Sequence, residues 1–187
     1  LDRGIGRRDQ LVRDLISGPV TWDGGRRAKF GPRTVTDVHE YPDLTLERAV
    51  VFSSNICMSI LGLRLGRPGI MEMLESFGFC GKTGIDLPFE AQGKHTGAEK
   101  WNPIYTPVSV SFGYEVMVTP LQLCRAFAAL VNGGYLLKPR IVDRVCQGGE
   151  EQAFPSRQVV GQPISAETSR DMREILRRVV EEGTARW

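Results

Sequence analysis

Residues 53–61 read Ser53-Ser54-Asn55-Ile56-Cys57-Met58-Ser59-Ile60-Leu61, a polar tripeptide that opens an apolar helical run. An upstream helix is predicted to begin at the N-cap Thr45, with Glu47 in its first turn. The apolar face of that helix consists of Leu46, Ala49, Val50 and Phe52. Two helices that meet at a Ser-Ser-Asn elbow would point the elbow at solvent or into a cleft. Ser53 and Asn55 then form a compact pair of hydrogen-bonding groups, whereas a mere helix start would use one serine as its cap, for which Ser54 is the better candidate.

Further helix signals lie on both sides of this elbow. Residues 8–16 have a helical spacing of apolar side chains, which predicts a short helix. The helix after the elbow is expected to run to Leu65-Gly66, and Pro68 then starts another that ends near Gly78. Because Pro occupies the first position, Thr119-Pro120 predicts a new helix start.

The helix after Thr119 is predicted to be central and buried, because its side chains are apolar almost all round. These side chains are Leu121, Leu123, Cys124, Phe127, Ala128, Leu130 and Val131. A last helix is expected from the Ser165 cap to Gly183. Its apolar stripe is Met172, Ile175, Leu176, Val179 and Val180.

Strand signals are short and scattered. An Asp-Gly turn at Asp23-Gly24 precedes extended pieces over 29–35, and two short strands are expected in 135–145. Residues 79–112 are rich in Gly, Pro, Thr and Lys, which predicts long loops. The sequence therefore predicts a helix-rich α+β fold with short strands and no continuous sheet.

Composition excludes several classes of protein. The 187 residues are 41% hydrophobic and 25% charged, as in ordinary globular domains, and a net charge of +2 gives no case for nucleic acid. No apolar run approaches the roughly 20 residues that span a bilayer. The chain opens on Leu1 rather than Met, which leaves room for an upstream membrane anchor.

The four cysteines predict no zinc site, because none of them forms a C-x-x-C pair. They are Cys57, Cys80, Cys124 and Cys146. Cys57 and Cys124 fall in apolar helical patterns, where a free thiol acts as a small hydrophobe. Buried free thiols and at least one disulfide both remain open.

Three ordered stretches carry a resemblance to a known family. The first stretch consists of Thr34-Val35-Thr36-Asp37-Val38-His39, residues 44–49 and the elbow. The second stretch is residues 77–88. The third stretch consists of Ser111-Phe112-Gly113-Tyr114, residues 118–123 and residues 128–134. Residues 180–185 follow the same pattern. In order and spacing these stretches resemble the transpeptidase domain of penicillin-binding proteins, closest to the monofunctional class B type. The resemblance implies that residues 1–187 are a partial transpeptidase domain, comprising the mostly helical lobe and its connecting loops without most of the central antiparallel sheet.

Two departures from the family pattern matter. The Ser-x-x-Lys motif that supplies the nucleophile is absent, since no serine has a lysine three residues later, and the family places that motif just before a segment resembling the start of this chain. Lys82-Thr83-Gly84 spells the third family motif, but it precedes the Ser-Phe-Gly-Tyr stretch, whereas the working motif lies on a strand beyond the tail that resembles residues 180–185. We interpret Lys82 as a loop residue, because Asp86 and Pro88 are poor in a central strand. Glu115 also stands where the family usually has Gly.

The resemblance implies acyl transfer from a D-Ala-D-Ala stem peptide through a serine ester, with β-lactams as substrate mimics. Ser53 would relay a proton toward the leaving nitrogen, and Asn55 would hold the substrate amide. No cofactor or metal is implied. The implied partners are stem peptides, β-lactams and proteins of a cell-wall synthesis complex, at the extracytoplasmic face of the cell membrane. The chain alone is expected to be inactive, because it lacks the nucleophile.

Two alternatives use the same fold without transpeptidation: a non-catalytic cell-wall scaffold or binding module, and a β-lactam sensor or β-lactamase. Ser53 and Asn55 argue against the scaffold, because a decayed site need not keep them. His39 and His95 are interpreted as structural or exposed, since no Ser or Cys partner pattern accompanies them. Trp101 and Tyr105 are read as loop aromatics that pack over a core rather than line a substrate groove, and Arg26-Arg27 as a solvated turn.

Overall fold

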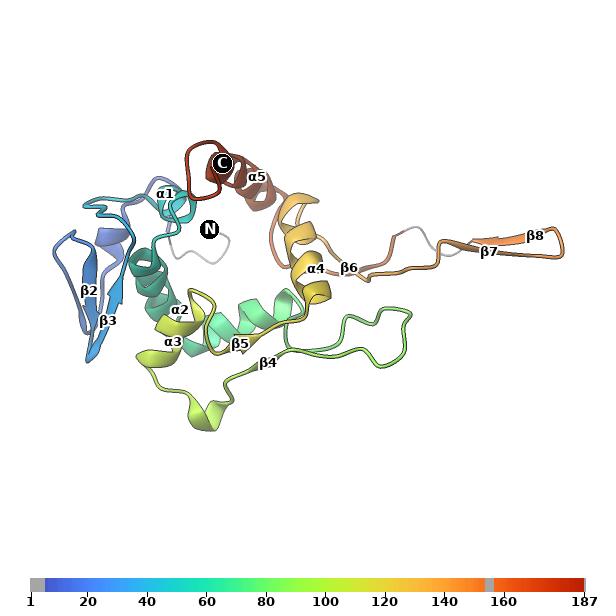
Figure 1. Ribbon diagram of the computed structural model, residues 1–187, viewed down its shortest axis with the longest axis horizontal. Coiled ribbons are helices and arrows are strands. Elements are labelled where there is room, and N and C mark those ends of the chain that lie inside the picture. Colours follow the sequence, from blue (N-terminus) through green and yellow to red (C-terminus); the bar gives the residue numbers. More distant parts are fainter. Residues whose placement is uncertain (1–5, 154–156, 187) are drawn as a thin grey trace. The chain divides into compact units, whose positions relative to one another are not determined.

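The computed structural model describes residues 6–153 and 157–186, and these form two compact units (Figure 1). Unit 1 comprises residues 6–72, 95–116 and 171–186. Unit 2 comprises residues 73–94, 117–153 and 157–170. The chain therefore passes from unit 1 to unit 2 and back twice. The sheets among the described residues have two or three strands each, as expected for a helix-rich α+β fold with short strands.

Unit 1 begins with a short 3-10 helix, η1 (Val12–Leu15), where the sequence predicted a longer helix. An antiparallel sheet follows, with strand order β1 (Val20–Trp22), β2 (Arg27–Phe30), β3 (Arg33–Thr36). Along β2 exposed and buried positions alternate, and Ala28 and Phe30 face the core. Figure 1 shows β2 and β3 beside the first half of α2 (Asn55–Ser76). The core of this unit also contains Val12, Leu15, Val35, Leu44, Ala49, Ile56, Cys57, Ile60 and Val108.

Two helices flank the elbow. Helix α1 (Leu46–Val51) is capped as predicted, because the Thr45 hydroxyl accepts the Arg48 N–H at 3.3 Å. Helix α2 is kinked at Gly66, whose φ of 60° and ψ of −175° are not helical, and Pro68 follows two residues later. The two helical pieces predicted on either side of Gly66 are therefore present and meet at this kink.

Shorter elements lie between residues 94 and 117. The pair β4 (Lys94–His95) and β5 (Val116–Met117) forms a two-stranded sheet. Between these strands lie η2 (Ala98–Lys100) and α3 (Tyr105–Val110). The region predicted as long loops therefore contains a short 3-10 helix and a short α-helix. Asn102 caps α3, since its side chain accepts the N–H groups of Ile104 and Tyr105.

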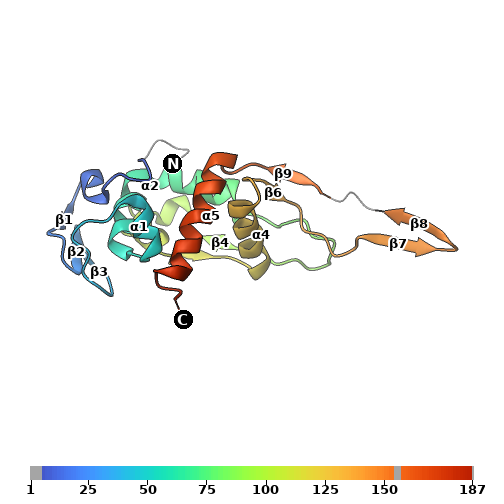
Figure 2. The same cartoon turned by 90° about the horizontal axis from the view of Figure 1, so that it is seen from above.

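Unit 2 is built on α4 (Pro120–Val131), which begins with a capping box. The Thr119 hydroxyl accepts the Gln122 N–H at 3.2 Å, and the Gln122 side chain accepts the Thr119 N–H at 2.8 Å. The small core of this unit consists of Phe77, Ala126, Ala129, Leu136 and Ile164. Strand β6 (Leu136–Leu137) pairs with β9 (Val159–Gly161), and β7 (Arg144–Gln147) pairs with β8 (Glu150–Ala153) as a hairpin, visible in Figure 2.

The prediction that α4 is buried on all sides is wrong for the described residues. Leu123, Phe127 and Val131 are 44%, 51% and 43% exposed, and the buried residues of the helix are Gln122 and Arg125 together with Ala126 and Ala129. The Gln122 amide donates to the carbonyls of Phe79 and Gly81, and Arg125 donates to those of Thr83 and Gly78. The buried side of α4 therefore serves two purposes: Ala126 and Ala129 pack in the core, while Gln122 and Arg125 supply donors to carbonyl groups of the irregular loop over residues 78–83.

Helix α5 (Ala166–Glu181) begins at the predicted Ser165 cap, whose hydroxyl accepts the Thr168 N–H at 3.0 Å. It ends before Gly183, as expected.

The four cysteines are free thiols: Cys57 is buried, Cys80 is half-buried, and Cys124 and Cys146 are exposed. Burial raises the pKa of the Cys57 thiol to about 11. The expectation of a buried thiol is confirmed for Cys57 and wrong for Cys124, which lies on the exposed face of α4.

Gly134 offers a test of unit 2. Its φ is +90°, and a Cβ there would clash with the Ile164 carbonyl oxygen, whereas Gly148 has a φ of +62° and open space around it. Gly134→Ala should therefore lower the free energy of unfolding by about 3 kcal/mol or more, since strain and clash add. Gly148→Ala, the matched control, should cost about 1 kcal/mol from strain alone. Chemical denaturation measures both; equal losses would contradict the packing of Gly134 on Ile164.

Candidate functional site

The Ser-Ser-Asn elbow connects the end of α1 to the start of α2. The Ser53 and Ser54 N–H groups donate to the carbonyls of Val50 and Ala49, at 3.1 and 3.0 Å, which closes the last turn of α1. Ser53 then adopts a left-handed conformation with φ of 52°, rare for a residue other than glycine. This single reversal turns Ser53 outward and Ser54 inward.

Ser54 is the structural member of the elbow. It is 1% exposed, and its hydroxyl donates to Asp37 Oδ2 at 2.5 Å while accepting the Cys57 N–H at 3.1 Å. The second carboxylate oxygen of Asp37 accepts the Ile56 N–H at 3.1 Å. Two of the N–H groups that begin α2 are therefore satisfied by side chains. The sequence identified Ser54 as the cap but assigned no role to Asp37, which lies 17 residues away in the chain.

Ser53 has the opposite environment. Its side chain is exposed, and its hydroxyl lies 3.0 Å from the hydroxyl of Thr184, beyond the end of α5. A serine hydroxyl has one proton to donate and can accept two hydrogen bonds, so this contact leaves capacity for a ligand. Ser53 is thus not a helix cap; its hydroxyl is exposed and can still bind a ligand.

Asn55 lies in the first turn of α2 and is half-buried. Its backbone carbonyl accepts the Ser59 hydroxyl at 2.7 Å, and its amide nitrogen is 3.5 Å from the Thr36 carbonyl. The latter distance is at the limit of a hydrogen bond, so the amide is loosely held and free to bind a peptide group. Ser53 and Asn55 therefore lie two residues apart at the elbow, with Ser53 exposed and Asn55 half-buried.

Charged groups fix the surroundings of the elbow. Glu47 on α1 accepts from Arg8 at 2.6 and 3.0 Å and also pairs with Arg178 on α5. Hydrogen bonding from Arg8 lowers the pKa of Glu47, and hydrogen bonding from Arg178 lowers that of Glu182, so both carboxylates stay ionised at neutral pH. Sequence reasoning missed this network, because its members are far apart in the chain and have no common motif.

Lys82-Thr83-Gly84 lies in a loop of unit 2, as predicted, and not on a strand. Thr83 is buried, and both its N–H and its hydroxyl donate to Glu90 Oε1 at 2.6 Å, while the Gly84 N–H donates to Glu90 Oε2 at 3.0 Å. The hydrogen bond from the Thr83 side chain lowers the pKa of Glu90. Glu90 therefore occupies the groups that this tripeptide would need to bind a substrate carboxylate.

The other residues singled out in the sequence make no hydrogen bond to Ser53 or Asn55 among the described residues. His39 and His95 are exposed, Trp101 is half-buried, and Tyr105 is 39% exposed. Arg26 and Arg27 are exposed next to the Asp23-Gly24-Gly25 turn, although the Arg26 Nε also donates to the Asp37 carbonyl at 3.3 Å. The interpretation of His39 and His95 as structural or exposed agrees with these positions, whereas Tyr105 begins α3 rather than lying in a loop and Arg27 begins β2 rather than lying in a turn.

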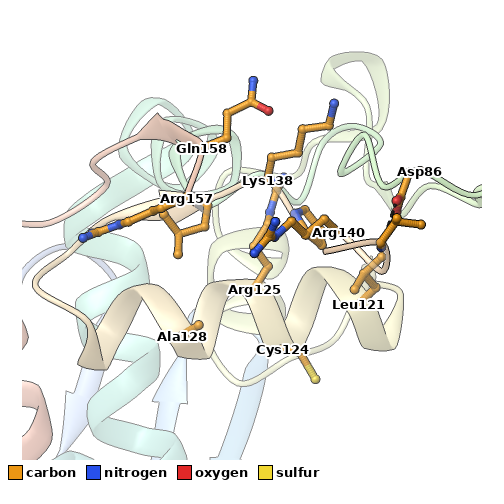
Figure 3. Close-up of a pocket in the computed structure, with 12 residues that line it drawn as sticks. Asp86, Leu121, Cys124, Arg125, Ala128, Lys138, Arg140, Arg157 and Gln158 are labelled. Carbon is orange, nitrogen blue, oxygen red and sulfur yellow. Dashed lines mark hydrogen bonds between the residues drawn. The ribbon is translucent and has the colours of Figure 1, made fainter. Parts of the chain in front are cut away.

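A pocket of about 570 Å³ lies in unit 2 between α4 and the segments 137–142 and 157–158 (Figure 3). Four cationic side chains line it: Arg125, Lys138, Arg140 and Arg157. Within the described residues the buried Nε of Arg125 has no hydrogen-bond partner. In Figure 3 Lys138 and Arg157 extend away from each other. The Arg157 Cζ lies over the Tyr135 ring, 4.6 Å from its centroid.

Within residues 6–153 and 157–186 no three His, Cys, Asp or Glu side chains are grouped so that they could hold a metal ion. Within the same ranges no helix combines the length and the apolar character needed to cross a membrane.

Comparisons with known proteins cover almost the whole chain. Residues 13–187 match the family model of the penicillin binding protein transpeptidase domain. Stage V sporulation protein D of Bacillus subtilis is 39% identical over 130 residues, which are 67% of this chain and 20% of that protein. Penicillin-binding protein PbpB of Mycobacterium tuberculosis is 30% identical over 184 residues, which are 97% of this chain and 25% of that protein.

The fold also matches solved structures. The crystal structure of penicillin-binding protein 3 from Mycobacterium tuberculosis in complex with aztreonam aligns with a TM-score of 0.74 and 28% identity, over 88% of this chain and 37% of that chain. The chain thus spans between a fifth and a quarter of the length of the two curated relatives described.

The structural role of Ser54, and the absence of one for Ser53, can be tested by measuring the free energy of unfolding of variants. Ser54→Ala should lower the free energy of unfolding by about 2–4 kcal/mol, because it removes a cap and leaves the buried Asp37 carboxylate short of a donor. Ser53→Ala, one residue away, should change it by less than about 0.5 kcal/mol, since this side chain is exposed. Urea titration measures both. A loss of stability in Ser53→Ala equal to that in Ser54→Ala would refute this assignment.

Proposed function

The chain belongs to the penicillin-binding protein transpeptidase family, and on that premise we propose that the protein containing it is a serine-type peptidoglycan D,D-transpeptidase. The predicted helix-rich fold is accordingly that of a portion of this transpeptidase domain. The observation that carries the proposal is the outward elbow, on which an exposed Ser53 hydroxyl and the loosely held Asn55 amide lie on a turn fixed by Asp37.

The proposed reaction is acyl transfer from a stem peptide ending in D-Ala-D-Ala. The oxygen of a nucleophilic serine outside residues 1–187 bonds to the penultimate D-Ala carbonyl carbon, and the bond from that carbon to the terminal D-Ala nitrogen breaks. The leaving nitrogen takes up a proton and departs as the amine of D-Ala. An amine of a neighbouring stem peptide then attacks the ester, which restores the serine hydroxyl and forms the cross-link.

Ser53 and Asn55 have separate roles in this scheme. Ser53 passes a proton toward the leaving nitrogen, which a hydroxyl can do because it both accepts and donates. Asn55 binds the substrate peptide group through its amide, whose nitrogen donates and whose oxygen accepts. Ser53 lies on the elbow and Asn55 is the first residue of α2, so the two groups are only two residues apart in the chain.

Substrates and location follow from the same chemistry. A D,D-transpeptidase acts on peptidoglycan stem peptides and reacts with β-lactams, and the relative PbpB is named a penicillin-binding protein. We therefore place the site on the extracytoplasmic side of the cell membrane, with proteins of a cell-wall synthesis complex as partners. A scaffold that kept the fold alone would need Ser54 as a cap, but it would have no use for an exposed Ser53 in a left-handed conformation.

A first prediction concerns the chain by itself. Residues 1–187 incubated with benzylpenicillin should show no covalent mass increase in intact-mass spectrometry, because no serine is followed three residues later by a lysine. The full-length protein should gain the mass of one benzylpenicillin. An adduct on residues 1–187 would show that the nucleophile lies within this chain, and the absence of an adduct on the full-length protein would refute the proposed function.

A second prediction concerns the proton relay. In the full-length protein Ser53→Ala should slow acylation by a fluorescent penicillin about a hundredfold or more, the usual contribution of a positioned acid–base group. The matched control is Ser17→Ala, an exposed serine remote from the elbow, which should acylate at the wild-type rate. Wild-type acylation in Ser53→Ala would remove Ser53 from the mechanism and favour the scaffold reading of the elbow.

A further inference from the structure

Resting on the proposed function, we propose that Thr184 is a positioning residue for Ser53, and that the segment after α5 fixes the Ser53 hydroxyl for proton transfer. Thr184 Oγ1 lies 3.0 Å from Ser53 Oγ, and within the described residues this is the hydrogen bond that the Ser53 hydroxyl makes. The two residues are 131 positions apart. Thr184 touches no reacting atom in this scheme and acts only through Ser53.

The backbone of the preceding residue sets where Thr184 lies. A Cβ at Gly183 would clash with the Val51 carbonyl oxygen, so only glycine lets this chain segment approach the last residue of α1. The Gly183 N–H donates to the Arg178 carbonyl at 3.1 Å, and the Ala185 N–H donates to that of Val179 at 3.2 Å. Thr184 is therefore held between two backbone hydrogen bonds, on a segment packed directly against the start of the elbow.

The ion pairs described above hold the two helices together. Arg178, five residues before Gly183, pairs with Glu47 on α1 and with Glu182. The Glu47 side chain is 12% exposed and also pairs with Arg8, which in turn reaches Asp171 at 3.5 Å near the middle of α5. Because part of this network is shielded from water, it fixes the end of α5 relative to α1 better than an exposed pair would.

These contacts matter because Ser53 is otherwise poorly restrained. Its side chain is exposed, so its hydroxyl would rotate among three staggered positions without a fixed partner. One hydrogen bond to Thr184 selects a single position and leaves the remaining capacity of the hydroxyl for the substrate. Thr184 thereby holds the Ser53 hydroxyl in one orientation, which a flexible serine at the surface would not keep without a partner.

The test uses full-length protein and the near-isosteric Thr184→Val, which removes only the hydroxyl. The acylation rate constant for a fluorescent penicillin should fall about three- to tenfold, as expected for the loss of one orienting hydrogen bond, while the dissociation constant of the non-covalent complex stays unchanged. Thr184→Ser, which keeps the hydroxyl, should restore most of the rate. Thr34→Val, on an exposed position of β3, is the control and should acylate like wild type.

A second readout does not need acylation. In protein with 13C-labelled serine, the Ser53 Cβ resonance, assigned with Ser53→Ala, should shift and broaden in Thr184→Val and stay in place in Thr34→Val. If the wild-type protein is not acylated, the proposed function fails, but this resonance still tests the contact with Thr184. An unchanged resonance, an unchanged rate in Thr184→Val, or a change confined to the dissociation constant would overturn the inference.

Discussion

The buried carboxylate of Asp37 is the constraint on which the elbow depends. It is 4% exposed, accepts the Ser54 hydroxyl and the Ile56 N–H, and directly follows β3. Its backbone is tied to the sheet as well, because its N–H donates to the Arg26 carbonyl and its carbonyl accepts from the Arg26 side chain. A buried carboxylate is tolerated only when donors surround it. The sheet, the start of α2 and the inward turn of Ser54 therefore have to form together, and the outward turn of Ser53 follows from them.

Local signals in the sequence predicted the parts of the fold that depend on neighbouring residues. The Thr45 and Ser165 caps, the Gly66–Pro68 interruption and the start of α4 at Pro120 all occur as expected. Asp37 and Thr184 could not be assigned roles, because each acts on the elbow through one contact across 17 or 131 residues. A single aspartate or threonine has no periodicity, so only the three-dimensional structure shows which group it meets.

Helix α4 shows where pattern reasoning fails for a physical reason. Its many apolar side chains suggested burial, but among the described residues the large ones Leu123, Phe127 and Val131 are exposed, and Gln122 and Arg125 are buried beside Ala126 and Ala129. The loop at residues 78–83 presents carbonyl groups that need donors, and the Gln122 and Arg125 side chains supply them. Glu90 holds the other side of the same loop through Thr83 and Gly84. Lys82-Thr83-Gly84 therefore belongs to a loop in which the Thr83 N–H and hydroxyl and the Gly84 N–H already donate to Glu90 and stabilise the loop conformation.

The left-handed backbone conformation of Ser53 affects which residues evolution can place at this position. Glycine or asparagine would adopt a φ of 52° with less strain than serine, so stability alone favours replacing Ser53. Because its side chain is exposed, little packing would be lost by such a replacement. A serine in this conformation is a compromise in which a small loss of stability accompanies a hydroxyl at the surface. Lineages that lose the need for that hydroxyl should drift toward glycine or asparagine here, while Ser54 and Asp37 stay fixed by the fold.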